Sequence, residues 1–185
     1  MTSLVEDWLD GSAVNYGIAL IPTLNTGDDY FAVYPDGHPN GPRLEITAAC
    51  TTGQTTITST KGTYGYEKTP NRNSGACENL EIRSENNEVK FSVIEFDFGS
   101  ISSNCTISNA SLELTRGNTG QGGSFGFDIH RVTQTWDEGI GHPCEEQNSD
   151  LPGLTWNERV DGTAWTTPGG DYGGTVDASG PGGNN

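Results

Sequence analysis

Short segments in which apolar and polar residues alternate constrain the fold of this chain more than any other feature. In residues 90–98, Ile94, Phe96 and Phe98 share one face with Ser92, while the opposite face is less apolar. Alternation with a period of two residues is typical of a half-buried β-strand. Glycine (26 copies) and proline (9 copies) separate many such segments, and no long stretch has helical periodicity. The sequence therefore predicts an all-β fold in which the face of Ile94 points inward.

The size and charge of the chain narrow the class of protein further. At 185 residues it is long enough for one sandwich domain and too short for two of ordinary size. Its 25 acidic and 9 basic side chains give a formal net charge of -16. We expect no binding to nucleic acid, because the dominant attraction to the phosphate backbone would be reversed.

Four cysteines without any C-x-x-C spacing indicate two disulfides rather than a zinc site. They are Cys50, Cys77, Cys105 and Cys144, and the sequence allows three pairings. In one pairing, Cys105 with Cys144 ties down a long loop, and Cys50 with Cys77 fastens the early segment to the strands that follow. Disulfides indicate an oxidising compartment, so we expect the protein outside the cell or at the cell surface.

The first 20 residues have neither a basic start nor an uninterrupted apolar block, because Glu6, Asp7 and Asp10 intervene. We therefore expect no signal peptide and no membrane span in this stretch. For a secreted protein this implies that a signal was removed or that the chain is cut from a longer protein.

Residues 1–47 predict a short helix followed by three strands. Leu4, Val5, Trp8 and Leu9 share a helical face, and Gly11 is placed to end the helix. The strands are expected at residues 16–21, 31–34 and 43–46, each beside a proline.

Two tryptophans in β-type contexts mark a long loop within residues 132–165. Trp136 and Trp156 are each followed by polar residues suited to a turn, and a strand at residues 125–132 leads into the first of them. We expect both indoles to be buried and to anchor the loop onto the core, with Phe96 and Leu112 also buried.

The order of these motifs resembles that of DNRLRE-type modules, which occur in extracellular proteins of bacteria and archaea. The resemblance rests on residues 94–98 and 110–114 and on the two tryptophan motifs. It also rests on Thr2-Ser3-Leu4-Val5-Glu6-Asp7-Trp8, Asn15-Tyr16-Gly17 and Pro42-Arg43-Leu44-Glu45-Ile46, which are similar to the family's closing segment. Modules of this family are β-sandwiches and include carbohydrate-binding modules. The resemblance therefore implies a jelly-roll-like antiparallel β-sandwich without a catalytic role.

The chain departs from the family in one respect, because the family's last strands stand first. Residues 1–47 correspond to closing strands, residues 48–56 to a linker and residues 57–185 to the main body. The closing strands carry Tyr16, Ile18, Leu20, Leu44 and Ile46. They either fold back within the chain, as in a circular permutant, or complete a neighbouring subunit by donor-strand complementation. We expect the exchange between subunits, because a head-to-tail contact that does not close builds a filament.

The sequence carries no pattern for catalysis or for a transition metal. His38, His130 and His142 lie in separate contexts, and neither H-E-x-x-H nor G-x-S-x-G occurs. Asp137 and Glu158 would suit a glycosidase only at a particular separation in space, which a sequence does not give. We therefore do not expect an enzyme.

The candidate ligand sites lie in turns. Trp165 and Tyr172, within the glycine-rich end of the chain, are the candidate sugar-binding residues, since an exposed aromatic face can stack on a sugar ring. Oxygen-rich turns at residues 25–29 and 36–37 suit Ca²⁺, but the same residues commonly form turns without a metal, so no cofactor is expected. Asn104 and Asn109 match the N-glycosylation pattern.

The sequence thus favours a non-catalytic structural subunit of an extracellular filament or matrix, whose partners are copies of itself. The alternative is a carbohydrate-binding module that tethers a cell or an enzyme to polysaccharide.

Overall fold

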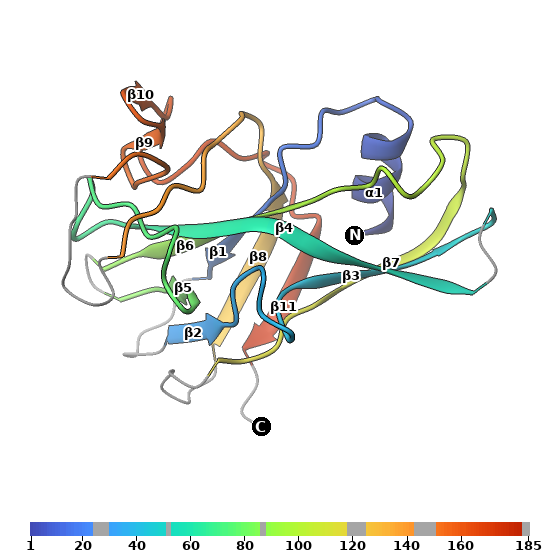
Figure 1. Cartoon of the computed structure of the whole chain (residues 1–185), viewed down its shortest axis with the longest axis horizontal. Helices are drawn as coiled ribbons and strands as arrows, with labels where there is room; N and C mark the ends of the chain where they lie inside the picture. The colour runs from blue at the N-terminus through green and yellow to red at the C-terminus, as the bar shows by residue number, and fades with distance from the viewer. Residues whose placement is uncertain (24–29, 51–52, 86–87, 118–124, 143–150, 183–185) are drawn as a thin grey trace.

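The computed structural model describes residues 1–23, 30–50, 53–85, 88–117, 125–142 and 151–182 (Figure 1). Within these residues one helix and eleven strands are present. They are α1 (Thr2–Leu9), β1 (Ile18–Pro22), β2 (Tyr30–Val33), β3 (Arg43–Ala48), β4 (Gln54–Tyr66), β5 (Leu80–Arg83), β6 (Lys90–Phe96), β7 (Ile107–Glu113), β8 (Phe125–Arg131), β9 (Glu158–Val160), β10 (Thr163–Ala164) and β11 (Ala178–Gly182). The predicted all-β fold is confirmed, and the described helix is too short to cross a membrane.

Nine of the strands form one antiparallel sheet. Its main path runs β11-β8-β1-β6-β4-β3-β7, while β2 pairs with β5 and β5 pairs with β6. The strands β9 and β10 form a separate two-stranded ribbon. Figure 1 shows α1 beside β3 and β7 at one end of the molecule, with β9 and β10 at the other. The jelly-roll connectivity that the resemblance implies stays a prediction.

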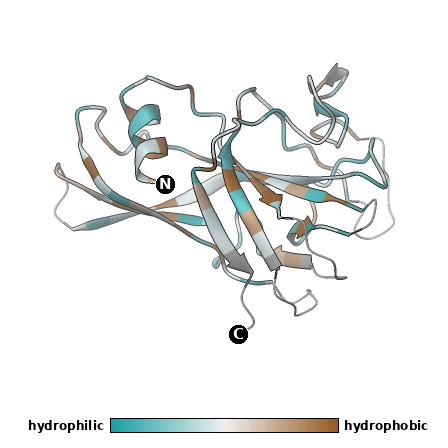
Figure 2. Ribbon diagram, turned by 180° about the vertical axis from the view of Figure 1, so that it is seen from behind, coloured by the Kyte–Doolittle hydropathy of each residue, from teal (hydrophilic) through white to brown (hydrophobic). Residues whose placement is uncertain are grey.

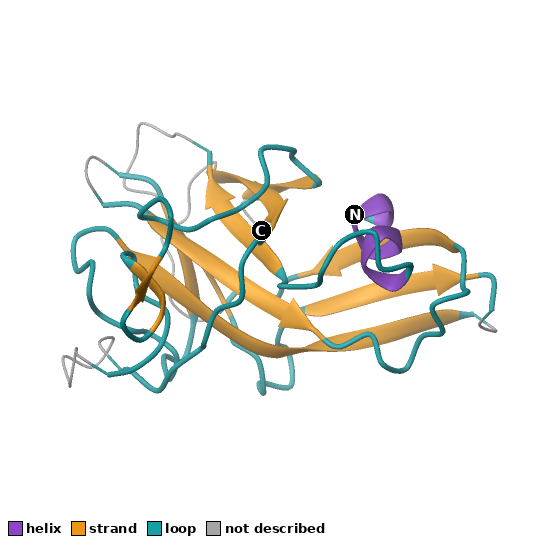
Figure 3. Cartoon of the chain, turned by 90° about the horizontal axis from the view of Figure 1, so that it is seen from above, coloured by secondary structure: helices purple, strands orange, loops and turns teal. Residues whose placement is uncertain are grey.

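The long strand β4 belongs to both halves of this sheet. Residues 54–58 pair with β3, and residues 59–66 pair with β6. The register shifts between Ser59 and Lys61, and an irregularity of this kind bends a strand and increases its twist. The sheet is therefore curved along its length (Figure 3), and β7 and β11 form its two ends.

The closing strands lie in the sheet of their own chain. Ile18 in β1 stands opposite Ile94 in β6, and Leu44 in β3 stands opposite Leu112 in β7. The candidate donor residues Ile18, Leu20, Leu44 and Ile46 are fully buried in one core cluster, while Tyr16 is partly buried against a second cluster that contains Trp136. The single chain thus has the fold-back arrangement, and the exchange between subunits stays a prediction. Residues 48–56, which were expected to form a linker, overlap two paired strands, since β3 ends at Ala48 and β4 begins at Gln54.

The sheet carries a hydrophobic core on each face. On one side Ile94 and Phe96 of β6 join the main cluster, which also contains the α1 residues Leu4, Val5 and Trp8. On the other side Phe91 and Val93 of β6 belong to a second cluster with Trp136, Leu154 and Trp165. The inward direction of Ile94 and Phe96 is confirmed. The opposite face is buried as well, because the chain after Val132 folds back over it.

The hydropathy of the residues along the strands alternates, as the burial of one strand face predicts. Figure 2 shows hydrophobic and hydrophilic residues alternating along several strands of the sheet. In β3 the alternation is complete, with Leu44, Ile46 and Ala48 buried and the residues between them partly exposed. Such a pattern is the one expected of a strand with a single core face.

One disulfide joins Cys50 to Cys105, with the two Cα atoms 5.4 Å apart. Cys77 is also disulfide-bonded, no described cysteine is free, and Cys144 lies outside the described residues. The pairing of Cys50 with Cys77 and of Cys105 with Cys144 is therefore wrong. Cys50 follows β3 and Cys105 precedes β7, and the antiparallel pairing of these strands brings the two thiols together.

Candidate functional site

A polar hollow of about 400 Å³ lies where the segment after β8 meets the segment after β10. Thr133 and Gln134 come from the first segment, and residues 166–172 supply the rest of the wall. The lining residues are Thr133, Gln134, Thr166, Thr167, Gly170, Asp171 and Tyr172. The hollow thus combines hydroxyl, amide and carboxylate groups with one aromatic ring.

Asp171 fixes the shape of this hollow. Its carboxylate oxygens accept hydrogen bonds from the backbone N–H groups of Thr166 (2.7 Å) and Thr167 (3.1 Å). Its carbonyl oxygen accepts two more from Thr133, one from the backbone N–H (3.0 Å) and one from the hydroxyl (3.1 Å). Because one residue ties both segments together, the wall is formed before any ligand arrives.

Tyr172 provides the aromatic surface of the hollow. It is 38% exposed and forms an isolated antiparallel bridge with Val132, which holds its backbone in place. Its ring centroid lies 5.1 Å from that of His130, whose Nδ1 is 2.9 Å from the carbonyl oxygens of Gly173 and Thr175. The exposure that was expected of this candidate sugar-binding residue is therefore present.

Trp165, the other candidate sugar-binding residue, does not line the hollow. It is only 4% exposed, its Nε1–H donates to the carbonyl oxygen of Thr155 (3.1 Å), and its ring meets Phe91 edge-on. Trp156, which was expected to be buried, is partly exposed. The loop is thus anchored by Trp136 and Trp165, and Trp156 packs against the same cluster while partly exposed.

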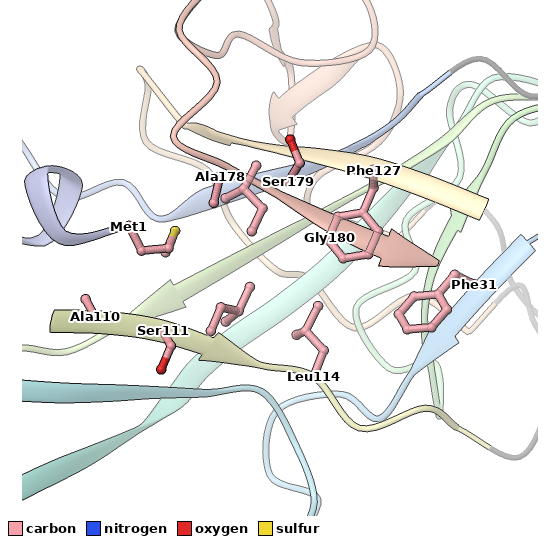
Figure 4. A pocket seen from close by; sticks show the side chains of 11 residues that line it. Met1, Phe31, Ala110, Ser111, Leu114, Phe127, Ala178, Ser179 and Gly180 are labelled. Atoms are coloured by element: carbon pink, nitrogen blue, oxygen red, sulfur yellow. The ribbon is translucent and has the colours of Figure 1, made fainter. Parts of the chain in front are cut away.

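A second, more apolar groove of about 420 Å³ runs between β7 on one side and β8 and β11 on the other (Figure 4). Phe31 of β2 lies toward one end of it and Met1 toward the other. The remaining lining residues are Ala110, Ser111, Leu112, Leu114, Phe127, Ile129, Ala178, Ser179 and Gly180. No pattern in the sequence indicates this groove, because it depends on how the two ends of the curved sheet lie relative to each other.

The beginning of the chain bridges the two sides of this groove. The nitrogen of Met1 donates to the carbonyl oxygen of Asp177 (3.0 Å), just before β11. The backbone N–H of Ala110 in β7 donates to the hydroxyl of Thr2 (3.2 Å). Leu112, which was expected to be buried, is half-buried because it borders the groove.

Glu138 and Asp36 form a carboxyl pair over the backbone of Gly62. The N–H of Gly62 donates to Oε1 of Glu138 (2.6 Å). Burial, together with the charge of Asp36 and a hydrogen bond to it, raises the pKa of Glu138 to about 7, against the opposing effects of the Gly62 N–H and Lys61. The described residues contain no group of three or more potential metal ligands at Asp36 or elsewhere, and the turn at residues 25–29 lies outside them.

The contribution of Glu138 to the stability of the fold should therefore fall as the pH rises from about 4.5 to about 7. A carboxyl group with a raised pKa in the folded state binds its proton more tightly there than in the unfolded chain, so it stabilises the fold below this window and not above it. After allowance for solvent screening, the loss is about 1 kcal/mol. Urea unfolding at pH 5 and pH 8 measures it. The unfolding free energy of wild type minus that of Glu138→Gln should fall by that amount between pH 5 and pH 8, and an unchanged difference would contradict the raised pKa of Glu138.

The remaining residues that the sequence analysis singled out, the two glycosylation candidates and the histidines, do not form a common site. Asn104 and Asn109 are both exposed, Asn104 next to the disulfide and Asn109 in β7. His38 stacks on Tyr34, with ring centroids 3.8 Å apart, whereas the ring of His130 contacts Tyr172. Glycosylation and the absence of catalysis stay predictions.

No family model matches the chain, and neither a curated protein nor a solved structure was found to be similar to it. The resemblance to DNRLRE-type modules therefore rests on the sequence motifs alone. The function of the polar hollow and of the apolar groove must therefore be inferred from the residues that line them.

Proposed function

We propose that this protein is a non-catalytic extracellular module that binds carbohydrate in the hollow around Tyr172. Binding sites for small polar ligands combine an apolar or aromatic surface with a few fixed polar groups, and this hollow has both. The observation that carries the proposal is the exposed ring of Tyr172 within a wall fixed by Asp171. The disulfide is compatible with an extracellular location.

Of the two functions that the sequence favours, we put carbohydrate binding first because the hollow offers a preformed site for a ligand. The closing strands pair within the chain here, so the sheet contains them without a donor strand from a neighbour.

Replacing Tyr172 by alanine should weaken binding to a polysaccharide ligand about tenfold, because tyrosine is enriched among the residues whose truncation at a binding interface costs more than about 1 kcal/mol. Affinity gel electrophoresis against immobilised polysaccharides measures this change. Tyr172→Phe should retain most of the affinity, since it keeps the ring. Tyr34→Ala, which removes a tyrosine outside the hollow, is the matched control. Equal affinity of wild type and Tyr172→Ala would reject this hollow as the site.

The groove between β7 and β11 favours a second function, that of a structural subunit. All pairings along the seven-strand path are antiparallel, so its end strands β7 and β11 run in the same direction. One added strand of opposite direction would therefore be antiparallel to both. The N–H of Ala110 points away from β3, toward Thr2, and the N–H of Leu112 faces the same side by alternation. A strand from a second copy of the chain could add to this edge and bury the apolar groove.

Association by strand addition should be visible by light scattering and electron microscopy of concentrated protein. High salt should promote it, because the charge of -16 makes copies repel one another at low ionic strength. Ser111→Lys, which adds a charge to the exposed edge of β7, should block association, whereas Thr58→Lys on the exposed face of β4 should not. A wild type that stays monomeric at high salt and high concentration would reject this second function.

A further inference from the structure

The hollow around Tyr172 is poor in positive charge. Its seven lining residues include one carboxylate, Asp171, and no lysine, arginine or histidine. The carboxylate is directed at the backbone N–H groups of Thr166 and Thr167, so it shapes the wall while contributing negative charge to it. A carboxylate or sulfate group on a ligand would find no cationic partner among these lining residues.

The arginines near this region are already engaged with other groups. Arg131 passes beside Gly173, but its guanidinium contacts the carboxylates of Asp7 (2.9 Å) and Asp177 (3.3 Å). Arg159 donates to the carbonyl oxygen of Thr135 (3.0 Å). Turning Arg131 toward an anionic ligand would leave two carboxylates without their partner, which opposes such a rearrangement.

The polar groups of the hollow match sugar hydroxyls instead. The hydroxyls of Thr133, Thr166 and Thr167 each have one donor and two acceptor positions, and the amide of Gln134 has both kinds. Gln134 Nε2 donates to Thr166 Oγ1 (3.3 Å) and Thr133 Oγ1 donates to Asp171, so these side chains have defined positions with acceptor capacity left over. A sugar hydroxyl likewise donates and accepts, and the face of Tyr172 offers an apolar surface for the C–H groups of a sugar ring.

From this combination we infer that the hollow binds a neutral polysaccharide and rejects polyuronates and sulfated glycans. The overall charge of -16 acts in the same direction, since a polyanion approaching the surface is repelled at low and moderate salt. The inference rests on the proposed carbohydrate binding and specifies the chemical class of its ligand.

The test is affinity electrophoresis of the full chain against two sets of immobilised polysaccharides. Xylan, mannan and mixed-linkage glucan form the neutral set, while alginate and polygalacturonate form the anionic set. We expect retardation by at least one neutral polymer, changed less than about twofold between low and high salt because no ion pair is involved. Tyr172→Ala should lose about tenfold in affinity for that polymer. Thr167→Lys, which places a cation on the rim, should gain binding to the anionic set.

The outcomes separate the inference from the proposed function. Wild-type binding to a polyuronate that Tyr172→Ala abolishes would overturn the neutral class while leaving carbohydrate binding in this hollow intact. Absence of binding to every polymer, or binding that Tyr172→Ala leaves unchanged, would overturn both. Tyr172→Phe and a thermal melt of each variant distinguish loss of the site from loss of the fold.

Discussion

Replacing Trp136 by alanine is expected to lower the free energy of unfolding by about 3–5 kcal/mol, the usual cost of emptying a buried aromatic site. Trp136 is fully buried in the second core, with Phe91, Val93 and Leu154 among its cluster. Its Nε1–H donates to the carbonyl oxygen of Tyr16 (2.8 Å), which fastens the start of the closing strands to the long loop. Urea or guanidinium unfolding measures the change as a lower midpoint with an unchanged slope.

Two further variants separate the causes of this loss. Trp136→Phe keeps an aromatic ring and removes the hydrogen bond, so it should cost less than the alanine variant. Trp156→Ala is the matched control, because Trp156 packs against the same cluster but is partly exposed, and its loss should be smaller. If Trp136→Ala costs less than about 1 kcal/mol, the second core does not contribute to stability as described.

Strands β1, β2, β3, β6 and β8 were predictable because each depends on a short-range pattern, whereas β9, β10 and β11 lie in segments that were expected to be loops and turns. Alternation in β3 and β6 and the prolines beside β1 and β3 are visible within a few residues of sequence. Helix α1 was predictable for the same reason, since Leu4, Val5 and Trp8 repeat at helical spacing and are all buried. Its last residue, Leu9, packs against the same core.

Burial of both faces of β6 was not predictable from β6 itself. Glu95 shares a face with Phe91 and Val93, which made that face resemble a solvated one. In the fold Glu95 forms an ion pair with Lys61 (2.9 Å), whose ammonium also lies over the ring of Trp136, 4.2 Å from its centroid. Segments far apart in sequence therefore decide whether this face is covered.

The pairing of Cys50 with Cys105 was missed, and the position of the closing strands was left open, for a related reason. Both depend on the registers of β3 with β7 and of β1 with β6, which no local pattern specifies, so the sequence left folding back and exchange between subunits as alternatives. In the candidate site, the exposure of Tyr172 was predicted from its glycine-rich surroundings. The burial of Trp165 was not, because it follows from the packing of Trp165 against Phe91.

Asn73 is a buried residue whose importance has no signal in the sequence beyond its place in a turn. It is fully buried and makes four hydrogen bonds, three to the segments around Glu138 and Leu154 and one within its own turn. Its Nδ2 donates to the carbonyl oxygens of Glu138 (2.6 Å) and Leu154 (2.8 Å). Its Oδ1 accepts from the N–H groups of Gly141 (2.6 Å) and Gly75 (3.2 Å). One side chain thus satisfies the backbone of three parts of the chain.

Replacing Asn73 by alanine should therefore lower the free energy of unfolding by about 4 kcal/mol, since each of the four bonds contributes about 1 kcal/mol and its buried backbone partners would be left unpaired. Asn73→Asp tests the geometry further, because it keeps the acceptor, loses the donor and buries a charge, and should destabilise at least as much. Asn104→Ala is the control, since Asn104 is exposed and its replacement should change stability by less than about 0.5 kcal/mol. Hydrogen exchange adds a local measurement, in which the N–H of Gly141 loses protection in Asn73→Ala more than the N–H groups of β3 do. Equal stability of Asn73→Ala and Asn104→Ala would show that the long loop is held by its tryptophans alone.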